Sequence, residues 1–374
     1  MIMSAAAVGL AIVAVLLIVA WIWWLSRPAP RRQPSPSESS RPPVLVVVPV
    51  FDEAPLIERK LENLAALKYP GTMQILIVDG GSTDGTTQRV RGWIARGAPF
   101  ELLLTSHRNK TAQLNEALRA QSFGDWILVT DADAELPADT LARLVEVAGA
   151  DATVGVVGLR VLPGVAHSLE SLHWRVTDWL RERESARGSA GIVAAPCYLV
   201  RRELLADLPA DTIADDVHVA CRAMLSGFRV GHARCTVVEL RSPRTLSALL
   251  RHKFRKADAY LREIVRFAPH VRRFAPSARA VFLWRAVLLT LVPLLGAAAC
   301  CLAALASVMH APKPPAVSAS LLVLLLLRPV RGAMRIALLA ALLGIVSVAA
   351  LVAQPFSRQT ASFPKIITPS DRIS

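Results

Sequence analysis

The sequence predicts an α/β domain with a mainly parallel sheet flanked by helices, together with transmembrane α-helices near both ends of the chain. From residue 44 to about 238, short β-rich runs alternate with helical stretches, which is typical of parallel strands covered by helices. The chain of 374 residues is also 53% hydrophobic, which is high for a soluble protein, and its longest apolar runs lie outside this region.

The formal net charge of +14 is compatible with several anionic partners. Combined with the apolar composition, it favours a membrane surface over nucleic acid, and no nucleic-acid-binding motif is recognisable, so we expect no nucleic-acid partner. The cysteines lack metal-ligand spacing, which indicates reduced thiols in a cytosolic compartment. They are Cys197, Cys221, Cys235, Cys300 and Cys301.

Residues 1–26 are predicted to form an N-terminal transmembrane anchor. The run is nearly uncharged and long enough to cross a hydrocarbon core of about 30 Å. Tryptophans at its end suit a membrane interface, and the arginines follow the run, so the N-terminus should lie outside and the next segment in the cytoplasm. A cleaved signal peptide, the alternative, carries its charges first. Residues 27–43, rich in Pro, Ser and Arg, read as a linker.

The domain is predicted to span residues 44–243 and to lie in the cytosol. Aliphatic runs predict its strands, and apolar residues at helical spacing predict its helices. Glycines and small polar residues between the second strand and its helix allow a tight turn close to a ligand. In order, we expect a strand at 44–48, a helix at 56–67, a strand at 74–78, a turn at 79–86, a strand at 101–104, a helix at 109–120 and a strand at 126–129.

Two carboxylates, Asp131 and Asp133, follow the strand at 126–129. In open α/β sheets, ligands bind beyond the carboxyl ends of the strands. Carboxylates crowded there repel each other unless a cation lies between them, and a divalent metal prefers such oxygen ligands. Taken alone, however, the same spacing is more often a turn or a helix cap.

Several motifs occur in order along the chain: Val48-Pro49-x-x-Asp52-Glu53, Asp79-Gly-Gly-Ser-Thr-Asp-Gly-Thr86, Asn109-Lys110-x-x-x-Leu114-Asn115, Thr130-Asp131-Ala132-Asp133, the acidic segment 211–216 and the basic segment 250–256. Together they resemble the motifs of the family 2 inverting glycosyltransferases with the GT-A fold. In its downstream motifs, the chain is similar to the branch that contains poly-N-acetylglucosamine and cellulose synthases.

The resemblance implies a nucleotide-sugar donor, expected to be a UDP-sugar, and a Mn²⁺ or Mg²⁺ cofactor. Asp133, together with Asp131, would hold the metal, and Asp131 would lie near the ribose or the metal. Glu53 and Asp79 would bind the nucleoside, and Lys110 would pair with a phosphate. Asp79 could instead be a turn residue, and Lys110 an exposed helix lysine.

Inversion requires a base that takes the proton of the attacking hydroxyl. By resemblance this base is Asp216, with Asp215 as a supporting carboxylate; the alternative is that both residues cap a helix. His218 is expected to be a neighbour of the site or a packing residue instead of a base. A helix at 168–187, which contains Trp174, would lie near the acceptor or belong to the core.

Residues 244–279 are predicted to form a basic interface region, with an amphipathic helix at 246–266 that meets anionic lipid headgroups. Arg251, Lys253 and Arg255 are candidates for binding the donor diphosphate as well. The processive branch has a Gln-x-x-Arg-Trp signature here, which this chain lacks. Processivity is therefore open.

Residues 280–353 should form two to three C-terminal transmembrane helices, followed by a tail at 354–374. The clearest crossing is at 286–308, the run at 316–327 is short for a crossing, and the run at 335–353 is long enough. Together with the anchor, these helices predict a multi-pass protein of the inner cell membrane with a cytoplasmic catalytic domain.

The sequence thus predicts a membrane-bound inverting glycosyltransferase that acts on a lipid or glycan acceptor. The alternatives are a processive polysaccharide synthase and a non-catalytic nucleotide-binding membrane protein with a GT-A-like fold. The small number of C-terminal helices favours a glycolipid or short glycan as product. A partner subunit or a homo-oligomer is compatible with the sequence.

Overall fold

The structure is a computed structural model that describes residues 2–28, 41–309 and 328–354. The described chain divides into two compact units. Of the described residues, the larger unit contains 28, 41–244 and 263–282, and the smaller unit contains 2–27, 245–262, 283–309 and 328–354.

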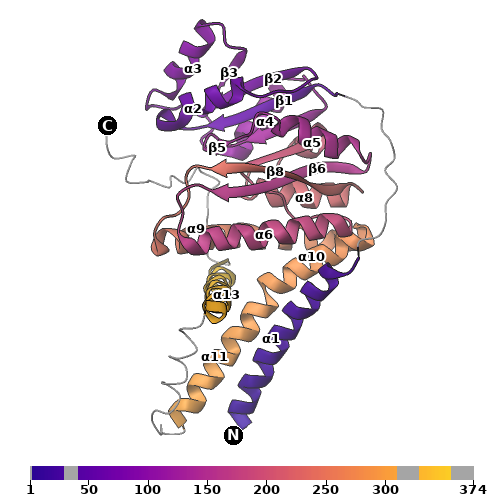
Figure 1. Ribbon diagram of the computed structural model, residues 1–374, viewed down its shortest axis with the longest axis vertical. Coiled ribbons are helices and arrows are strands. Elements are labelled where there is room, and N and C mark those ends of the chain that lie inside the picture. Colours follow the sequence, from indigo (N-terminus) through magenta and orange to yellow (C-terminus); the bar gives the residue numbers. More distant parts are fainter. Residues whose placement is uncertain (1, 29–40, 310–327, 355–374) are drawn as a thin grey trace. The chain divides into compact units, whose positions relative to one another are not determined.

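The larger unit is built on an eight-stranded sheet with the strand order β3-β2-β1-β4-β7-β6-β8-β5 (Figure 1). The strands are β1 (Val44–Val50), β2 (Met73–Asp79), β3 (Phe100–Leu104), β4 (Trp126–Thr130), β5 (Ala134–Glu135), β6 (Val154–Pro163), β7 (Cys197–Arg201) and β8 (Arg229–Glu239).

This sheet is mixed, so the expectation of a mainly parallel sheet holds for only part of it. Strands β3, β2, β1 and β4 pair in parallel, as do β6 and β8. Strand β7 is antiparallel to both β4 and β6, and β5 is antiparallel to β8. The chain leaves β6 at one end of the strands and re-enters the sheet as β7 at that same end. Strand β7 therefore runs antiparallel to β6.

Helices cover both faces of the sheet. Side chains of β1 alternate between two cores: Val44 and Val46 pack with α2, α3 and α5, whereas Leu45 and Val47 pack with α4, α7 and α8. Because both faces are buried, β1 is a continuous aliphatic run. The helices are α2 (Ala54–Ala65), α3 (Thr86–Ala95), α4 (Lys110–Ala120), α5 (Thr140–Gly149), α6 (Ser168–Arg187), α7 (Arg202–Leu205) and α8 (Asp215–Leu225).

The predicted elements between residues 44 and 129, and the helix at 168–187, each correspond to an observed element with bounds shifted by two residues or less. Strand β1 continues through Pro49 to Val50, two residues beyond the predicted end at residue 48. Proline cannot donate a backbone hydrogen bond, and the pairing of β1 with β4 already stops at Val47, so only β2 lies beside β1 at Pro49.

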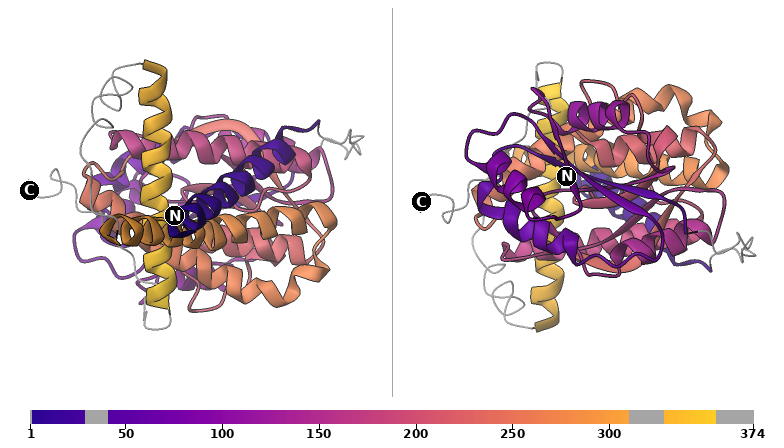
Figure 2. Two further views of the ribbon diagram at one scale, coloured as in Figure 1. Left: turned by 90° about the horizontal axis from the view of Figure 1, so that it is seen from below. Right: turned by 90° about the horizontal axis from the view of Figure 1, so that it is seen from above.

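The smaller unit contains α1 (Ile2–Ser26), most of α9 (Leu246–Phe267), the end of α10 (Pro276–Leu289), α11 (Leu291–Met309) and α13 (Arg328–Ala353). Helix α1 packs along α11, and α13 crosses α11 (Figure 2). The ring of Trp21 stacks on Trp24, with centroids 5.2 Å apart, and lies 5.6 Å from the ring of Trp284.

Two described helical stretches, Ile2–Ser26 and Pro276–Ala306, are long and apolar enough to cross a membrane by length and composition. Helix α13 contributes a shorter apolar stretch, Leu339–Ala353. The crossing predicted at 286–308 therefore overlaps a stretch that begins ten residues earlier and ends at Ala306. The run at 316–327 and the tail at 355–374 lie outside the described residues.

Gly124 allows the chain to enter β4. Its φ of +75° lies in the left-handed region, and a Cβ there would come within 2.8 Å of the carbonyl oxygen of Pro43 and 3.1 Å of the nitrogen of Leu45. Both neighbours are backbone atoms that lead into β1. Gly149, at the end of α5, has open space around its Cβ position and no positive φ.

We predict that Gly124→Ala lowers the free energy of unfolding by about 1–3 kcal/mol, because the new methyl group meets backbone at an unfavourable φ. Gly149→Ala, the matched control, should change it by less than about 1 kcal/mol, in the stabilising direction. Thermal melting of the full chain in detergent, followed by tryptophan fluorescence, measures both. Equal melting temperatures for the two variants would show that the space beside Gly124 does not matter.

Candidate active site

The ends of β1 and β2 lead into two turns that are bonded to each other. Asp52, with a φ of +51°, accepts a hydrogen bond from the nitrogen of Thr83 at 2.8 Å, and its own nitrogen donates to Ser82 Oγ at 2.8 Å. The nitrogen of Glu53 donates to Thr86 Oγ1 at 2.8 Å. These contacts fix the predicted donor-binding turn at 79–86 against the acidic segment after β1.

Asp79 is fully buried at the end of β2. One carboxylate oxygen accepts from the nitrogen of Ser82 at 2.8 Å, and the other accepts from Thr87 Oγ1 at 2.5 Å. Both oxygens are thus engaged within the turn, as expected for a turn residue. The contact of Asp79 with the nucleoside stays a prediction.

Glu53 forms an ion pair with Arg241, which follows β8, at 2.5 Å between Oε2 and Nη1. Burial raises the pKa of Glu53 to about 7; Arg241 opposes this rise, and the charges of Asp133 and Asp131 add to it. Arg241 was not among the predicted site residues, because β8 was not predicted. A cation two residues after a strand was the signal that could have found it.

Asp131 and Asp133 lie in a tight turn between β4 and β5. The nitrogen of Asp131 donates to the carbonyl of Pro196 at 3.0 Å, and the carbonyl of Asp133 accepts from the nitrogen of Leu240 at 2.8 Å. Burial, and after it the neighbouring charge of Asp131, raise the pKa of Asp133 to about 6, against the opposing charges of Arg241 and Lys60. The structure therefore brings both predicted metal ligands and Glu53 into one electrostatic environment.

Lys110, in the first turn of α4, connects this acidic turn to α8. Its Nζ lies 2.8 Å from Asp131 Oδ1, 3.1 Å from Asp215 Oδ2 and 3.1 Å from the carbonyl oxygen of Ala195. Burial opposes the charge of Lys110, but the two carboxylates outweigh burial and raise its pKa above the ordinary range. Lys110 is therefore a mostly buried bridge, not an exposed helix lysine.

Asp215 has a second partner in Tyr198, whose hydroxyl donates to Asp215 Oδ2 at 2.7 Å. Burial raises the pKa of Tyr198 well above the usual value, and the adjacent carboxylate of Asp215 raises it further. The Tyr198 hydroxyl consequently stays protonated and remains a donor. Asp215 is held by one cation and one hydroxyl.

Asp216 is also buried, in the first turn of α8, where its Oδ1 accepts a hydrogen bond from the nitrogen of Val217 at 3.0 Å. A carboxylate in the first turn of a helix interacts favourably with the helix dipole. The N-cap residue of α8 is Ala214, so neither aspartate occupies the capping position that the alternative expected. The role of Asp216 as a base stays a prediction. His218 faces Glu263 at 2.8 Å, as expected for a packing residue near the site.

Lys60 is a second buried cation at this site, and it was not among the predicted site residues. It lies on α2 with 2% of its surface exposed and donates to Thr130 Oγ1 at 2.9 Å and to the carbonyl of Ala134 at 2.6 Å, on either side of the acidic turn. Burial lowers its pKa to about 8, and the nearby carboxylates limit the decrease. A lysine on the apolar face of a helix was the available signal.

Three predicted donor-binding residues lie on the part of α9 that belongs to the smaller unit: Arg251 is exposed, Lys253 is buried and Arg255 is half-buried. Their contact with the diphosphate stays a prediction. Trp174 of α6 is buried in the core with α2 and α5, as the core alternative expects.

Asp131 and Asp133 suit a divalent cation that also binds a substrate phosphate. Among residues 2–28, 41–309 and 328–354, no group of three or more His, Cys, Asp or Glu side chains is placed to hold a metal. Mg²⁺ is usually held by one or two carboxylates together with phosphate oxygens and water, so two carboxylates are sufficient. The donor set thus fits Mg²⁺ or Mn²⁺ bound together with a nucleotide.

Residues 45–208 match the sequence family Glycosyl transferase family 2. An N-acetylglucosaminyltransferase of Rhizobium meliloti is 26% identical over 255 residues, which cover 63% of this chain and 59% of that protein. A poly-β-1,6-N-acetyl-D-glucosamine synthase of Staphylococcus aureus is 22% identical over 216 residues, which cover 56% of this chain and 52% of that protein. The chain therefore spans little more than half the length of these relatives.

A solved structure extends the similarity to nearly the whole chain. The mannosyltransferase PcManGT of Pyrobaculum calidifontis, in complex with GDP-Man and Mn²⁺, superimposes with a TM-score of 0.77 at 27% sequence identity. The match covers 96% of this chain and all of that one. The family match assigns residues 45–208 to a Glycosyl transferase family 2 domain, and the structural similarity gives the chain the fold of the GT-A glycosyltransferases.

Proposed function

We propose that the protein is a membrane-bound inverting glycosyltransferase that moves a sugar from a nucleotide-sugar to a lipid or glycan acceptor at the cytoplasmic face of the membrane. The observation that carries the proposal is the bridge formed by Lys110. It joins the acidic turn after β4, where a metal-bound diphosphate would lie, to the acidic start of α8, where a base is expected.

Asp131 and Asp133 would hold Mn²⁺ or Mg²⁺, which supplies Lewis-acid neutralisation of the charge that develops on the leaving diphosphate. Arg241, paired with Glu53 beside this turn, adds a cation on the same side. Glu53 would accept hydrogen bonds from the ribose once it is ionised. Arg251, Lys253 and Arg255 remain candidates for further diphosphate contacts.

Asp216 is the proposed base. Asp215 is engaged by Lys110 and Tyr198, contacts that suit a supporting carboxylate. Asp216 is the adjacent acid on the same helix and would take the proton of the acceptor hydroxyl as it attacks the anomeric carbon. Attack from the face opposite the leaving diphosphate gives inversion.

Two donors are supported by different comparisons. The structure that matches nearly the whole chain was solved with GDP-Man. The relatives are named for N-acetylglucosamine transfer and match 56–63% of the chain. GDP-mannose is therefore the first donor to test and UDP-N-acetylglucosamine the second. The second donor tests the expectation of a UDP-sugar.

The proposed membrane location rests on the two long apolar stretches and on the amphipathic helix α9. Helix α9 carries basic groups suited to anionic headgroups. A processive synthase is the second candidate, supported by the similarity to the Staphylococcus aureus synthase. Mass spectrometry of the product separates single transfer from polymer synthesis. The presence of Asp131, Asp133 and Asp216 argues against a non-catalytic protein.

Asp133→Asn should lower metal-dependent sugar release from GDP-mannose or UDP-N-acetylglucosamine at least about 100-fold, because a ligand of the charge-neutralising cation is lost. Asp125→Asn, which removes an exposed carboxylate at the opposite end of β4, should remain within twofold of the parent chain. Coupled detection of the released nucleotide over a Mn²⁺ titration measures both. A wild-type chain that leaves both donors intact at every Mn²⁺ concentration would overturn the proposed function.

The raised pKa of Glu53 predicts a pH dependence. Below about pH 7 the carboxyl group of Glu53 is protonated. Arg241 then loses its negatively charged partner, and the ribose loses one hydrogen-bond acceptor. We expect kcat/KM for the donor, which reports on the free enzyme, to rise as the pH increases through about 7. Glu53→Gln should abolish this rise. An identical pH profile in that variant would assign the ionisation to another group.

Lys110→Met should destabilise the protein by about 3–5 kcal/mol, because it leaves the carboxylates of Asp131 and Asp215 without the cation between them. It should also abolish transfer. Lys68→Met, on the exposed surface, should change neither property. Thermal melting and transfer rate should be measured together. Wild-type melting of Lys110→Met would contradict the bridging role.

A further inference from the structure

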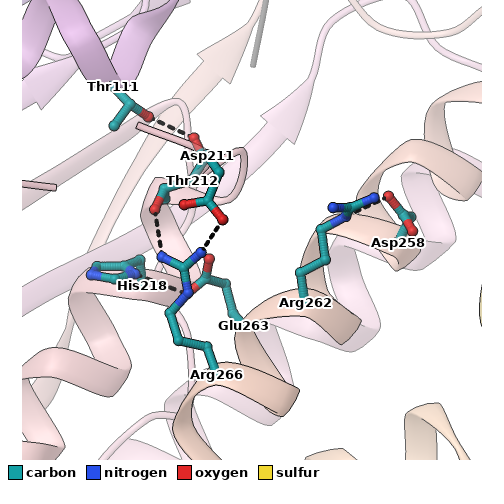
Figure 3. A network of polar contacts seen from close by, with 8 residues as sticks. All are labelled: Thr111, Asp211, Thr212, His218, Asp258, Arg262, Glu263 and Arg266. Carbon is teal, nitrogen blue, oxygen red and sulfur yellow. Dashed lines mark hydrogen bonds and ion pairs between the residues drawn. The ribbon is translucent and has the colours of Figure 1, made fainter. Parts of the chain in front are cut away.

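The last turns of α9 form a polar network with the elements that carry the proposed active site (Figure 3). Glu263 Oε2 lies 2.8 Å from His218 Nδ1, and their side chains are 2% and 5% exposed. Three residues later on α9, Arg266 Nε lies 3.8 Å from the same glutamate oxygen. The ring of His218 also packs edge-on against Phe267, with centroids 5.2 Å apart.

Arg266 extends the network to the segment before α8. Its Nη2 lies 2.6 Å from Asp211 Oδ2, and its Nη1 donates to Thr212 Oγ1 at 3.2 Å. The carbonyl oxygen of Thr212 accepts a hydrogen bond from Thr111 Oγ1 at 2.8 Å. Figure 3 shows these side chains converging on segment 211–212 from α4 on one side and α9 on the other.

Both arms of the network end one or two residues from groups of the proposed site. Thr111 follows Lys110 on α4, and His218 lies two residues after Asp216 on α8. Residues two apart on a helix do not face each other, so His218 does not act on the proton of Asp216 directly. It holds the helix from another side, and segment 211–214 leads straight into that helix.

Buried charged groups are costly unless they are paired, so Glu263 fixes His218, and Arg266 fixes segment 211–212, in definite places. The two residues act together because both belong to one helical turn. We propose that Glu263 and Arg266 are positioning residues, which set the first turn of α8, and with it the Asp216 carboxylate, relative to Lys110. This inference rests on the proposed function of Asp216 as the base.

The test uses the full chain in lipid nanodiscs and the variants Glu263→Gln and Arg266→Gln. Misplacement of a reacting group by about 1 Å costs up to about 100-fold in rate. We therefore expect kcat to fall about 10- to 100-fold while the donor KM stays within about twofold. Arg262→Gln is the matched control: it removes the same charge from the same helix, but its pair with Asp258, at 3.0 Å, lies within α9.

Arg266→Lys is a second variant that keeps the charge. Lysine presents a compact ammonium instead of a planar fork, so it should hold Asp211 or Thr212 but not both, and should recover only part of the lost kcat. Full recovery would show that charge alone matters. Equal losses in Arg262→Gln and Arg266→Gln, or a rise in donor KM equal to the fall in kcat, would overturn the positioning role.

Amide hydrogen exchange gives a readout that does not depend on turnover. Residues 211–218 should exchange faster in Glu263→Gln and Arg266→Gln than in the wild type. Their exchange rates should be unchanged in Arg262→Gln. Unchanged exchange in all variants would overturn the proposal even if activity fell, and so would faster exchange with wild-type kcat. An inactive wild-type chain would instead contradict the proposed function, while the exchange data would still decide whether α9 fixes α8.

Discussion

The proposed site depends on one buried ammonium group between two carboxylates. Asp131 follows β4 and Asp215 begins α8, and the chain passes through more than eighty residues between them. Two carboxylates both within 3.1 Å of one atom would repel each other strongly if that atom were not cationic. Lys110 therefore makes it possible for the acidic turn of the sheet and the acidic start of α8 to share one site.

Two further buried charged residues stabilise the elements on either side of Lys110. Lys60 supports the turn of Asp131 and Asp133 from α2, and Glu263 holds α8 through His218. Buried ion pairs contribute little net stability, because desolvation offsets most of the attraction, but an incorrect arrangement leaves a charge unpaired. The network thus favours one arrangement of the helices around the sheet.

Much of the site's position could be predicted from the sequence, since β1, β2 and β4 are mostly buried, largely apolar runs with acidic residues at or just beyond their carboxyl ends. The partners of those residues could not. Lys110 lies at the start of a helix, where the sequence does not distinguish an exposed lysine from a buried one. The residues that follow β8 can be placed at the site only once that strand is known. In strand β8, Arg and His residues interrupt the apolar run, and β7 runs antiparallel to β4. Neither strand therefore continues the pattern of apolar parallel strands that the first half of the domain shows.

The charges around the acidic turn have a consequence for the order of events. Five carboxylates, of Glu53, Asp131, Asp133, Asp215 and Asp216, lie near three basic side chains, those of Lys60, Lys110 and Arg241. The formal excess is negative, whereas a nucleoside diphosphate is itself an anion. Under the proposed function, these mostly buried groups would disfavour the bare nucleotide and favour it together with a divalent cation. Donor and cation would then be best suited to enter together, and the loss of one would weaken the binding of the other.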